Sequence, residues 1–307
     1  MVHIVTKNIK GNEYLYLVES IRNGSKIIQK TIKYIGRKRP IPKEEFECMK
    51  LSHSNKDWIL HFHKDYLSYQ HHEKLKKKSK LYQEYLTTLD KTSLEKEQHR
   101  FLSRFIANSN AIEGSTLTPN ETYQYLFEQT IPSGKTKKEL HMTDNLFEAW
   151  KYIESHFRET PTISHLLKLH ALVNKGIEED STLGKLKSVQ NYIGDKHTTS
   201  YLFIEEKLQQ LLEWIQNAKK EVNDFEIAFQ SHAQFEFIHP FVDGNGRVGR
   251  LLLNWLLLQK KLSPLAITVR KRSEYIVSLE NATRGNVRAI CEFCFEEYIN
   301  QYDFVQS

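Results

Sequence analysis

Cysteine is scarce in this sequence of 307 residues. Its three cysteines (Cys48, Cys291 and Cys294) cannot all pair within the chain, and so few thiols are typical of a protein kept in a reducing compartment. No apolar run reaches the roughly 18 residues that a membrane-spanning helix needs. The first residues lack the long apolar core of a secretory signal, and there is no internal repeat or low-complexity tract. We therefore expect a soluble cytoplasmic protein with no membrane partner.

Positive charge is concentrated at one end of the chain. Residues 1–39 hold nine Lys and Arg against two Glu, whereas the net charge of the whole chain is +6, so the remaining residues are close to neutral. Such a basic module indicates either a contact with nucleic acid or a solvated surface that keeps the protein soluble. Both interpretations stay open from the sequence. The length of the chain suits one or two domains.

The first forty residues predict β-structure. Segments 2–9, 13–22 and 25–35 are rich in Ile, Val, Tyr and Thr, and they are separated by Gly11-Asn12 and Asn23-Gly24. These pairs favour tight hairpin turns because both residue types tolerate positive φ. We expect a small three-stranded antiparallel β-meander over residues 1–40. A meander of this size is marginal by itself, so it should pack on the next part of the chain.

Helical periodicity begins near residue 43. A charged helical connector is expected over residues 41–92, with a solvated lysine-rich face between 74 and 80, and a larger helical domain over residues 93–307. Within that domain the predicted helices cover about 94–110, a helix opening at Thr118-Pro119, then 138–157, 162–177, 205–221, 224–237, 245–260, 271–283 and 286–301. Residues 184–203 interrupt this series and predict an isolated hairpin. Cys291 and Cys294 lie in a helical context without a second cysteine pair, which favours buried core cysteines over a metal site.

The segment from 224 to 260 carries a polar string between two apolar helices. The first helix should end at His239-Pro240, because proline disfavours helical backbone in the residue before it. The second begins near Asn245 and contains a leucine-rich run from 251 to 258. Asp243-Gly244-Asn245-Gly246 therefore falls at a helix N-terminus, where unpaired N–H groups and the helix dipole attract an anion.

The residues around this N-terminus suit a polyphosphate. Arg247 and Arg250 are three positions apart and can bind phosphate oxygens through their guanidinium groups. Asp243 is a hard oxygen ligand of the kind that holds Mg²⁺ together with phosphates. His239 has an ordinary pKa near neutrality, as a base that removes a hydroxyl proton requires. Glycine-rich turns and single histidines are often only structural, but two arginines in a first helical turn need an anionic partner.

The complete string His239-Pro-Phe-x-Asp-Gly-Asn-Gly-Arg-x-x-Arg250 resembles the active-site signature of the Fic (filamentation induced by cAMP) family. The resemblance extends over residues 95–300. It implies a mainly α fold, a Fic-type helical bundle with a β-hairpin flap, which here follows the β-meander. It also implies a protein adenylyltransferase that moves AMP from ATP to a Ser, Thr or Tyr hydroxyl of a target protein, or of the chain itself.

The resemblance assigns a role to each residue of the string. His239 is the general base, Phe241 anchors the loop in the core, and Asp243 holds Mg²⁺. Gly244, Asn245 and Gly246 form the anion hole around the α- and β-phosphates, Arg247 contacts the β-phosphate and Arg250 the γ-phosphate. Tyr275 lies beside the nucleotide base.

A second motif resembles the inhibitory motif of the same family. Ser109-Asn-Ala-Ile-Glu113-Gly114 fits the pattern [Ser/Thr]-x-x-x-Glu-[Gly/Asn], and it precedes the core as in the branch with an N-terminal inhibitory helix. This implies that Glu113 pairs with Arg250 in place of the γ-phosphate. The resemblance also places a target-binding flap at 184–203, with Lys187, Gln190 and Tyr192 as flap residues and Lys187 where relatives carry Arg.

Several functional alternatives remain open at this point. Tyr275-Ile276 stands where many relatives have paired tyrosines, and Thr283 where many have an adenine-contacting Asn, so UTP and GTP are alternatives to ATP. A hydrolase that removes AMP, with Glu113 aligning a water, is the second hypothesis. A nucleotide-sensing regulator that binds nucleic acid through residues 1–39 is the third. A homodimer is also open.

Overall fold

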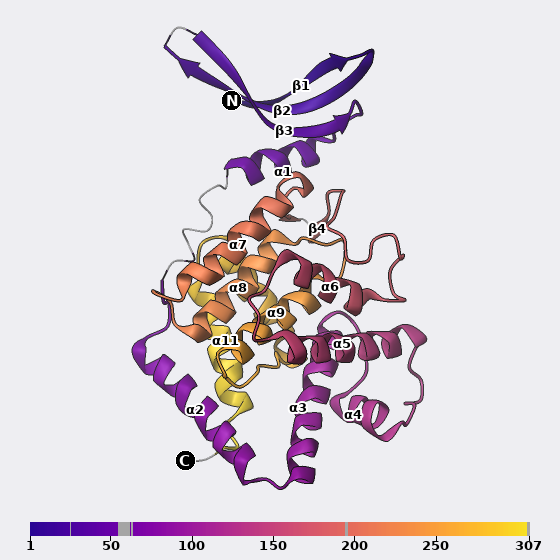
Figure 1. Ribbon diagram of the computed structural model, residues 1–307, viewed down its shortest axis with the longest axis vertical. Helices are drawn as coiled ribbons and strands as arrows, with labels where there is room; N and C mark the ends of the chain where they lie inside the picture. Colours follow the sequence, from indigo (N-terminus) through magenta and orange to yellow (C-terminus); the bar gives the residue numbers. More distant parts are fainter. Residues whose placement is uncertain (25, 55–61, 63, 194–195, 306–307) are drawn as a thin grey trace.

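The protein, described here by a computed structural model, consists of a helical body with a small sheet at one end (Figure 1). The structure describes residues 1–24, 26–54, 62, 64–193 and 196–305. The mainly α fold with an N-terminal meander is confirmed. Among the described residues, no helix is both long and apolar enough to cross a membrane.

The N-terminal sheet contains β1 (Val2–Ile9), β2 (Asn12–Asn23) and β3 (Lys26–Arg37), antiparallel in the order β1-β2-β3. The turn between β1 and β2 uses Lys10 and Gly11, both at positive φ, one position before the predicted pair. The sheet rests on α1 (Lys43–Ser54) and on the short helix η2 (Tyr201–Phe203), where Leu17, Met49 and Phe203 form a small buried cluster. The expected packing of the meander on later residues is therefore confirmed.

The helices agree with the predicted ones to within a few residues. Their bounds are α2 (Tyr69–Thr88), α3 (Lys91–Ile112), α4 (Pro119–Glu128), α5 (Lys137–His156), α6 (Ile163–Asn174), α7 (Ile204–Ala218), α8 (Asp224–Ile238), α9 (Asn245–Gln259), η3 (Val269–Lys271), α10 (Arg272–Thr283) and α11 (Arg288–Gln301). Helix α4 begins as expected, with a capping box between Thr118 and Glu121 and Pro119 in its first turn.

Helices α8 and α9 lie at the centre of the body, and most residues of both are buried. Leu75 and Tyr82 of α2 belong to the same core, so the charged connector packs on the helical domain through its apolar side. Cys291 and Cys294 are fully buried, as predicted. The loop from 239 to 244 joins the two central helices, and this rigid setting fixes the polar string.

The predicted hairpin at 184–203 is much smaller than expected. Only β4 (Tyr192–Ile193) and β5 (Lys196–His197) pair, and the predicted turn at Gly194-Asp195 lies outside the described residues. Residues 201–203 form η2 instead of a strand. The β-rich composition was misleading because the Thr198 hydroxyl accepts a hydrogen bond from the Lys187 side chain and donates to the Asn191 carbonyl, instead of the segment pairing with a second long strand.

Candidate active site

His239 ends helix α8 in a left-handed conformation, with φ of 51° and ψ of 63°. Its N–H donates to the Phe235 carbonyl (2.9 Å), which closes the last turn. The helix thus ends just before Pro240, as predicted, with His239 in a left-handed conformation. Phe241 anchors the following loop in the core: it is fully buried and stacks on His170 with 4.0 Å between ring centroids.

The loop to α9 is closed by the Asn245 side chain. Its Oδ1 accepts from the Phe241 N–H and its Nδ2 donates to the Phe241 carbonyl, both at 2.9 Å. The side-chain amide of Asn245 is thus committed to the loop. The backbone bonds of α9 begin with the Val248 N–H donating to the Gly244 carbonyl, which leaves the N–H groups of the first turn for an anion. Gly244 has φ of 76° and touches Asn174, where a side chain would collide.

Arg250 and Glu113 form the predicted ion pair. The Arg250 Nη2 lies 2.8 Å from the Glu113 Oε1, and Arg250 also donates through Nε to the Ser109 hydroxyl (2.8 Å) and through Nη2 to the Ser109 carbonyl (2.9 Å). Burial alone would lower the pKa of Arg250, but Tyr275 and Glu113 outweigh it and raise the pKa well above its ordinary value. Gly114 follows at φ of 102° and turns the chain away from α3.

The Glu113 carboxylate lies over the N-terminus of α9. A side-chain carbon added at Gly246 would collide with Glu113 Oε1, so the carboxylate rests directly against this glycine. About a third of the Glu113 side chain is exposed, whereas Arg250 is buried. The carboxylate therefore already stands where the sequence predicts an anion.

Arg247 is held differently from Arg250. Its guanidinium donates to the Val173 carbonyl (3.0 Å) and to the Asn174 side chain (2.9 Å) at the end of α6, and it lies 3.7 Å from Asp243. The sequence placed both arginines on one side of the first turn, but their guanidinium groups reach different helices. Arg247 thus satisfies the Val173 carbonyl in the last turn of α6, and its contact with the β-phosphate stays a prediction.

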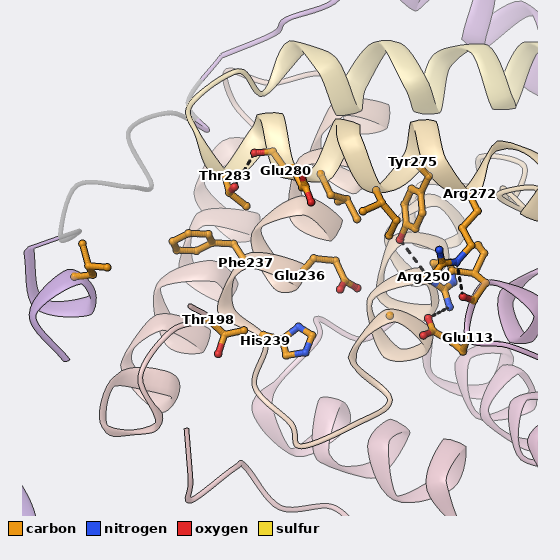
Figure 2. A pocket seen from close by; sticks show the side chains of 15 residues that line it. Glu113, Thr198, Glu236, Phe237, His239, Arg250, Arg272, Tyr275, Glu280 and Thr283 are labelled. Carbon is orange, nitrogen blue, oxygen red and sulfur yellow. Dashed lines mark hydrogen bonds and ion pairs between the residues drawn. The ribbon is translucent and has the colours of Figure 1, made fainter. Parts of the chain in front are cut away.

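A cavity of about 560 Å³ lies between α3, α8, α9 and α10. Figure 2 shows Arg250, Glu113 and Tyr275 at one end and Phe237, Thr283 and Glu280 at the other, with His239 and Glu236 between them. Tyr275 is buried, and its hydroxyl contacts Arg250 (3.4 Å) and His232 (2.6 Å). Tyr275 therefore lies at the Arg250 end, whereas Thr283 lies with Phe237 and Glu280 at the opposite end.

His239 is neutral at physiological pH. Burial and then the nearby Lys187 lower its pKa from 6.5 to about 4. A neutral imidazole can accept a proton from a hydroxyl group.

Asp243, four residues further on, is largely exposed, with 59% of its side chain accessible.

The flap residues brace the loop more than they face solvent. Lys187 is buried and donates to the side chains of Asn191 (2.6 Å) and Thr198 (2.7 Å), and burial lowers its pKa to about 7. Its N–H donates to the Pro240 carbonyl (2.9 Å). Gln190 bonds to Asn191 and Thr198 in the same network, and the side chain of Tyr192 lies outside the described residues. Target binding by these residues stays a prediction.

Two polar residues of α8 escaped the sequence reasoning. His232 is fully buried and Glu236 is partly buried, with 13% of its side chain accessible, at positions seven and three residues before His239. Their spacing puts all three on one face of α8. Their spacing from His239, on the helix that ends at this residue, was the signal that could have identified them.

Comparisons with known proteins agree with this geometry. Residues 160–257 match the model of the Fic/DOC family. The chain contains a Fic/DOC family domain. It is 31% identical over 204 residues to the protein adenylyltransferase Fic of Nematostella vectensis, covering 64% of this chain and 48% of that protein. It is 26% identical over 207 residues to the protein adenylyltransferase fic-1 of Caenorhabditis elegans, covering 66% of this chain and 41% of that protein.

Solved Fic structures share the fold. A fragment of Fic-1 from C. elegans superposes with a TM-score of 0.66 at 23% identity, over 76% of this chain and 71% of that one. A Fic domain containing signaling protein from Bacteroides thetaiotaomicron superposes with a TM-score of 0.67 at 22% identity, over 76% of this chain and 95% of that one. The chain spans about half or less of the length of the curated relatives that it matches.

Proposed function

We propose that this chain is a protein adenylyltransferase, which moves AMP from ATP to a hydroxyl side chain of a protein. The observation that carries the proposal is the placement of a neutral His239 beside an anion site, built from the N-terminus of α9 and Arg250, in one cavity. The names of the two curated relatives support the same activity.

Residues of the chain account for the proton transfer and for the stabilisation of the phosphate charge. The target hydroxyl gives its proton to His239 as its oxygen attacks the α-phosphorus of ATP. The bond from that phosphorus to the oxygen bridging to the β-phosphate breaks, and pyrophosphate leaves. The N–H groups of Asn245 and Gly246 and the Arg250 guanidinium stabilise the negative charge on the phosphates, and they are fixed before the substrate binds.

Asp243 fits the Mg²⁺ ion that ATP chemistry implies. Its carboxylate is exposed beside the N-terminus of α9, and among the described residues it is the one carboxylate of the loop from 239 to 246. A single carboxylate suits Mg²⁺, which keeps several waters and phosphate oxygens as ligands. When bound there, the ion would neutralise phosphate charge.

Glu113 supports an autoinhibited form of this enzyme. Its carboxylate pairs with Arg250 and rests on Gly246, so ATP and Glu113 compete for the same cation. We infer that ATP binds in a reactive pose only when Glu113 has left. About a third of the Glu113 side chain is exposed, and an exposed carboxylate can orient a water, so removal of AMP from a modified protein is the second candidate.

The proposal is tested by intact mass spectrometry of the Glu113→Gly protein incubated with Mg²⁺ and ATP, UTP or GTP in turn. We expect the mass of an AMP group on the protein itself, or on proteins of an added lysate, with ATP giving the largest yield. If only UTP or GTP adds a nucleotide group, that nucleotide is the donor and the proposal of ATP is wrong. No added mass with any nucleotide, together with loss of AMP from a pre-modified target by the wild-type protein, would favour the hydrolase.

Replacement of Asp243 should change the metal requirement. Asp243→Ala is expected to lower transfer and to shift the Mg²⁺ titration to higher concentrations, because one ligand of the ion is lost. The measurement is the transfer rate against Mg²⁺ concentration, with the exposed Asp180→Ala protein as the control. An unchanged titration would remove Asp243 from the metal site.

A further inference from the structure

We propose that Glu236 is a specificity residue that binds the ribose hydroxyls of the nucleotide. The inference rests on the proposed function, since it takes the cavity to be the nucleotide site. It adds a contact to the sugar, between the residues already assigned to the phosphates and those at the far end of the cavity, around Phe237 and Thr283.

The first support is the position of Glu236 in the cavity. Arg250 and Glu113 mark the anion end, while Phe237, Thr283 and Glu280 mark the far end (Figure 2). Glu236 lies between these ends, on the last turn of α8. A nucleotide that puts its phosphates at α9 and its base at the far end must bring its sugar past this side chain.

The second support is a buried polar atom with no hydrogen bond. Only 13% of the Glu236 side chain is accessible, and its Oε1 has no hydrogen-bond partner among the residues that the structure describes. The nearest side-chain nitrogen, His232 Nδ1, is 3.9 Å away, beyond hydrogen-bond distance. Leaving such a group unpaired is unfavourable. Oε1 itself is enclosed against Gly249 of α9, so a ligand in the cavity contacts the remaining, accessible part of the Glu236 side chain.

The third support is the charge of Glu236. Its pKa is raised to about 8, mainly by burial, with Arg250 opposing the shift and Glu113 adding to it. The carboxyl group is therefore mostly protonated at neutral pH and does not repel a triphosphate. A neutral carboxyl group can donate one hydrogen bond and accept others, which matches a pair of sugar hydroxyls.

The surrounding residues hold the carboxyl group in this place. A side chain at Gly249 of α9 would collide with both Glu236 and His232, so the glycine makes the close approach of α8 and α9 possible. Burial also keeps His232 neutral by lowering its pKa to about 3. Arg250 already has Glu113, Ser109 and Tyr275 as partners, so Glu236 is not required to balance its charge.

The test compares binding of ATP, 2′-deoxy-ATP and 3′-deoxy-ATP, each with Mg²⁺, by calorimetry in the Glu113→Gly protein. A lost hydrogen bond to a buried group corresponds to roughly 5- to 150-fold in affinity, and we expect ATP to bind about tenfold more tightly than at least one deoxy analogue. Adding Glu236→Ala should lower the affinity for ATP to that for the deoxy analogue, and it should leave the affinity for the analogue unchanged. Adding Glu236→Gln should preserve the preference, because the amide also donates and accepts.

Thr283→Val, at the far end of the cavity from Arg250, is the matched control. It should change the affinities for ATP and the deoxy analogues by the same factor. Melting temperatures show whether each variant is folded, and Glu236→Gln should be at least as stable as its parent at pH 8, because it removes a group whose ionisation the fold disfavours. If the Glu236→Ala protein still transfers AMP and keeps the parental preference for ATP, the sugar contact is wrong while the proposed function stands. Failure of transfer with all nucleotides would instead overturn the proposed function.

Discussion

Replacing His239 with Ala is expected to abolish transfer while ATP affinity stays within a few-fold of the parent. The reason is a division of roles within the cavity. His239 handles the proton of the attacking hydroxyl, whereas the phosphates are bound by the N-terminus of α9 and by Arg250. Loss of a general base commonly lowers a rate by about 10²- to 10⁴-fold. Transfer and ATP binding would both be measured in the Glu113→Gly background, so that the carboxylate does not limit the rate.

His3→Ala provides a matched control, since His3 lies on the N-terminal sheet rather than in the cavity. It should leave transfer unchanged. A His239→Ala protein that retains transfer within about tenfold of its parent would contradict the general-base role. A large loss of ATP affinity would mean that His239 contributes to binding the nucleotide rather than to moving a proton.

Removal of Glu113 should have the opposite effect on activity from removal of Arg250. Glu113→Gly is expected to raise self-modification or target modification strongly, because Arg250 and the N-terminus of α9 become free for the γ-phosphate. Arg250→Ala also breaks the 2.8 Å ion pair, but it deletes the phosphate contact, so activity should not rise. The measurement is the rate of nucleotide transfer, with Mg²⁺ and each nucleotide.

The contrast between the two variants separates competition from a purely structural ion pair. If the pair only stabilised the fold, both substitutions would act alike. Removing one partner of a fully buried pair costs about 3–5 kcal/mol, and less is expected for Glu113 because a third of its side chain is exposed. Melting temperatures must therefore accompany the activities. A folded Glu113→Gly protein no more active than wild type with ATP, UTP or GTP would exclude autoinhibition by this residue and favour the hydrolase.

Much of the fold was predictable because local patterns specify it. The turn pairs near residues 11 and 24 fixed three strands, and the capping box at Thr118 fixed the start of a helix. The extent of the flap was not predictable. Residues 184–203 have a β-rich composition, but a strand requires a partner, and here Lys187, Asn191 and Thr198 bond to one another instead.

The sequence by itself determined that a polar string stands at the N-terminus of a buried helix, because apolar periodicity, Pro240 and two glycines are local features. The resemblance to Fic proteins added the contact between Glu113 and Arg250. Only the tertiary structure decided where the other side chains point: Arg247 reaches the end of α6, Lys187 is buried under the flap, and Glu236 enters the cavity. The physical reason is that side-chain direction and protonation depend on which helices pack together, and no local pattern in the chain encodes that packing.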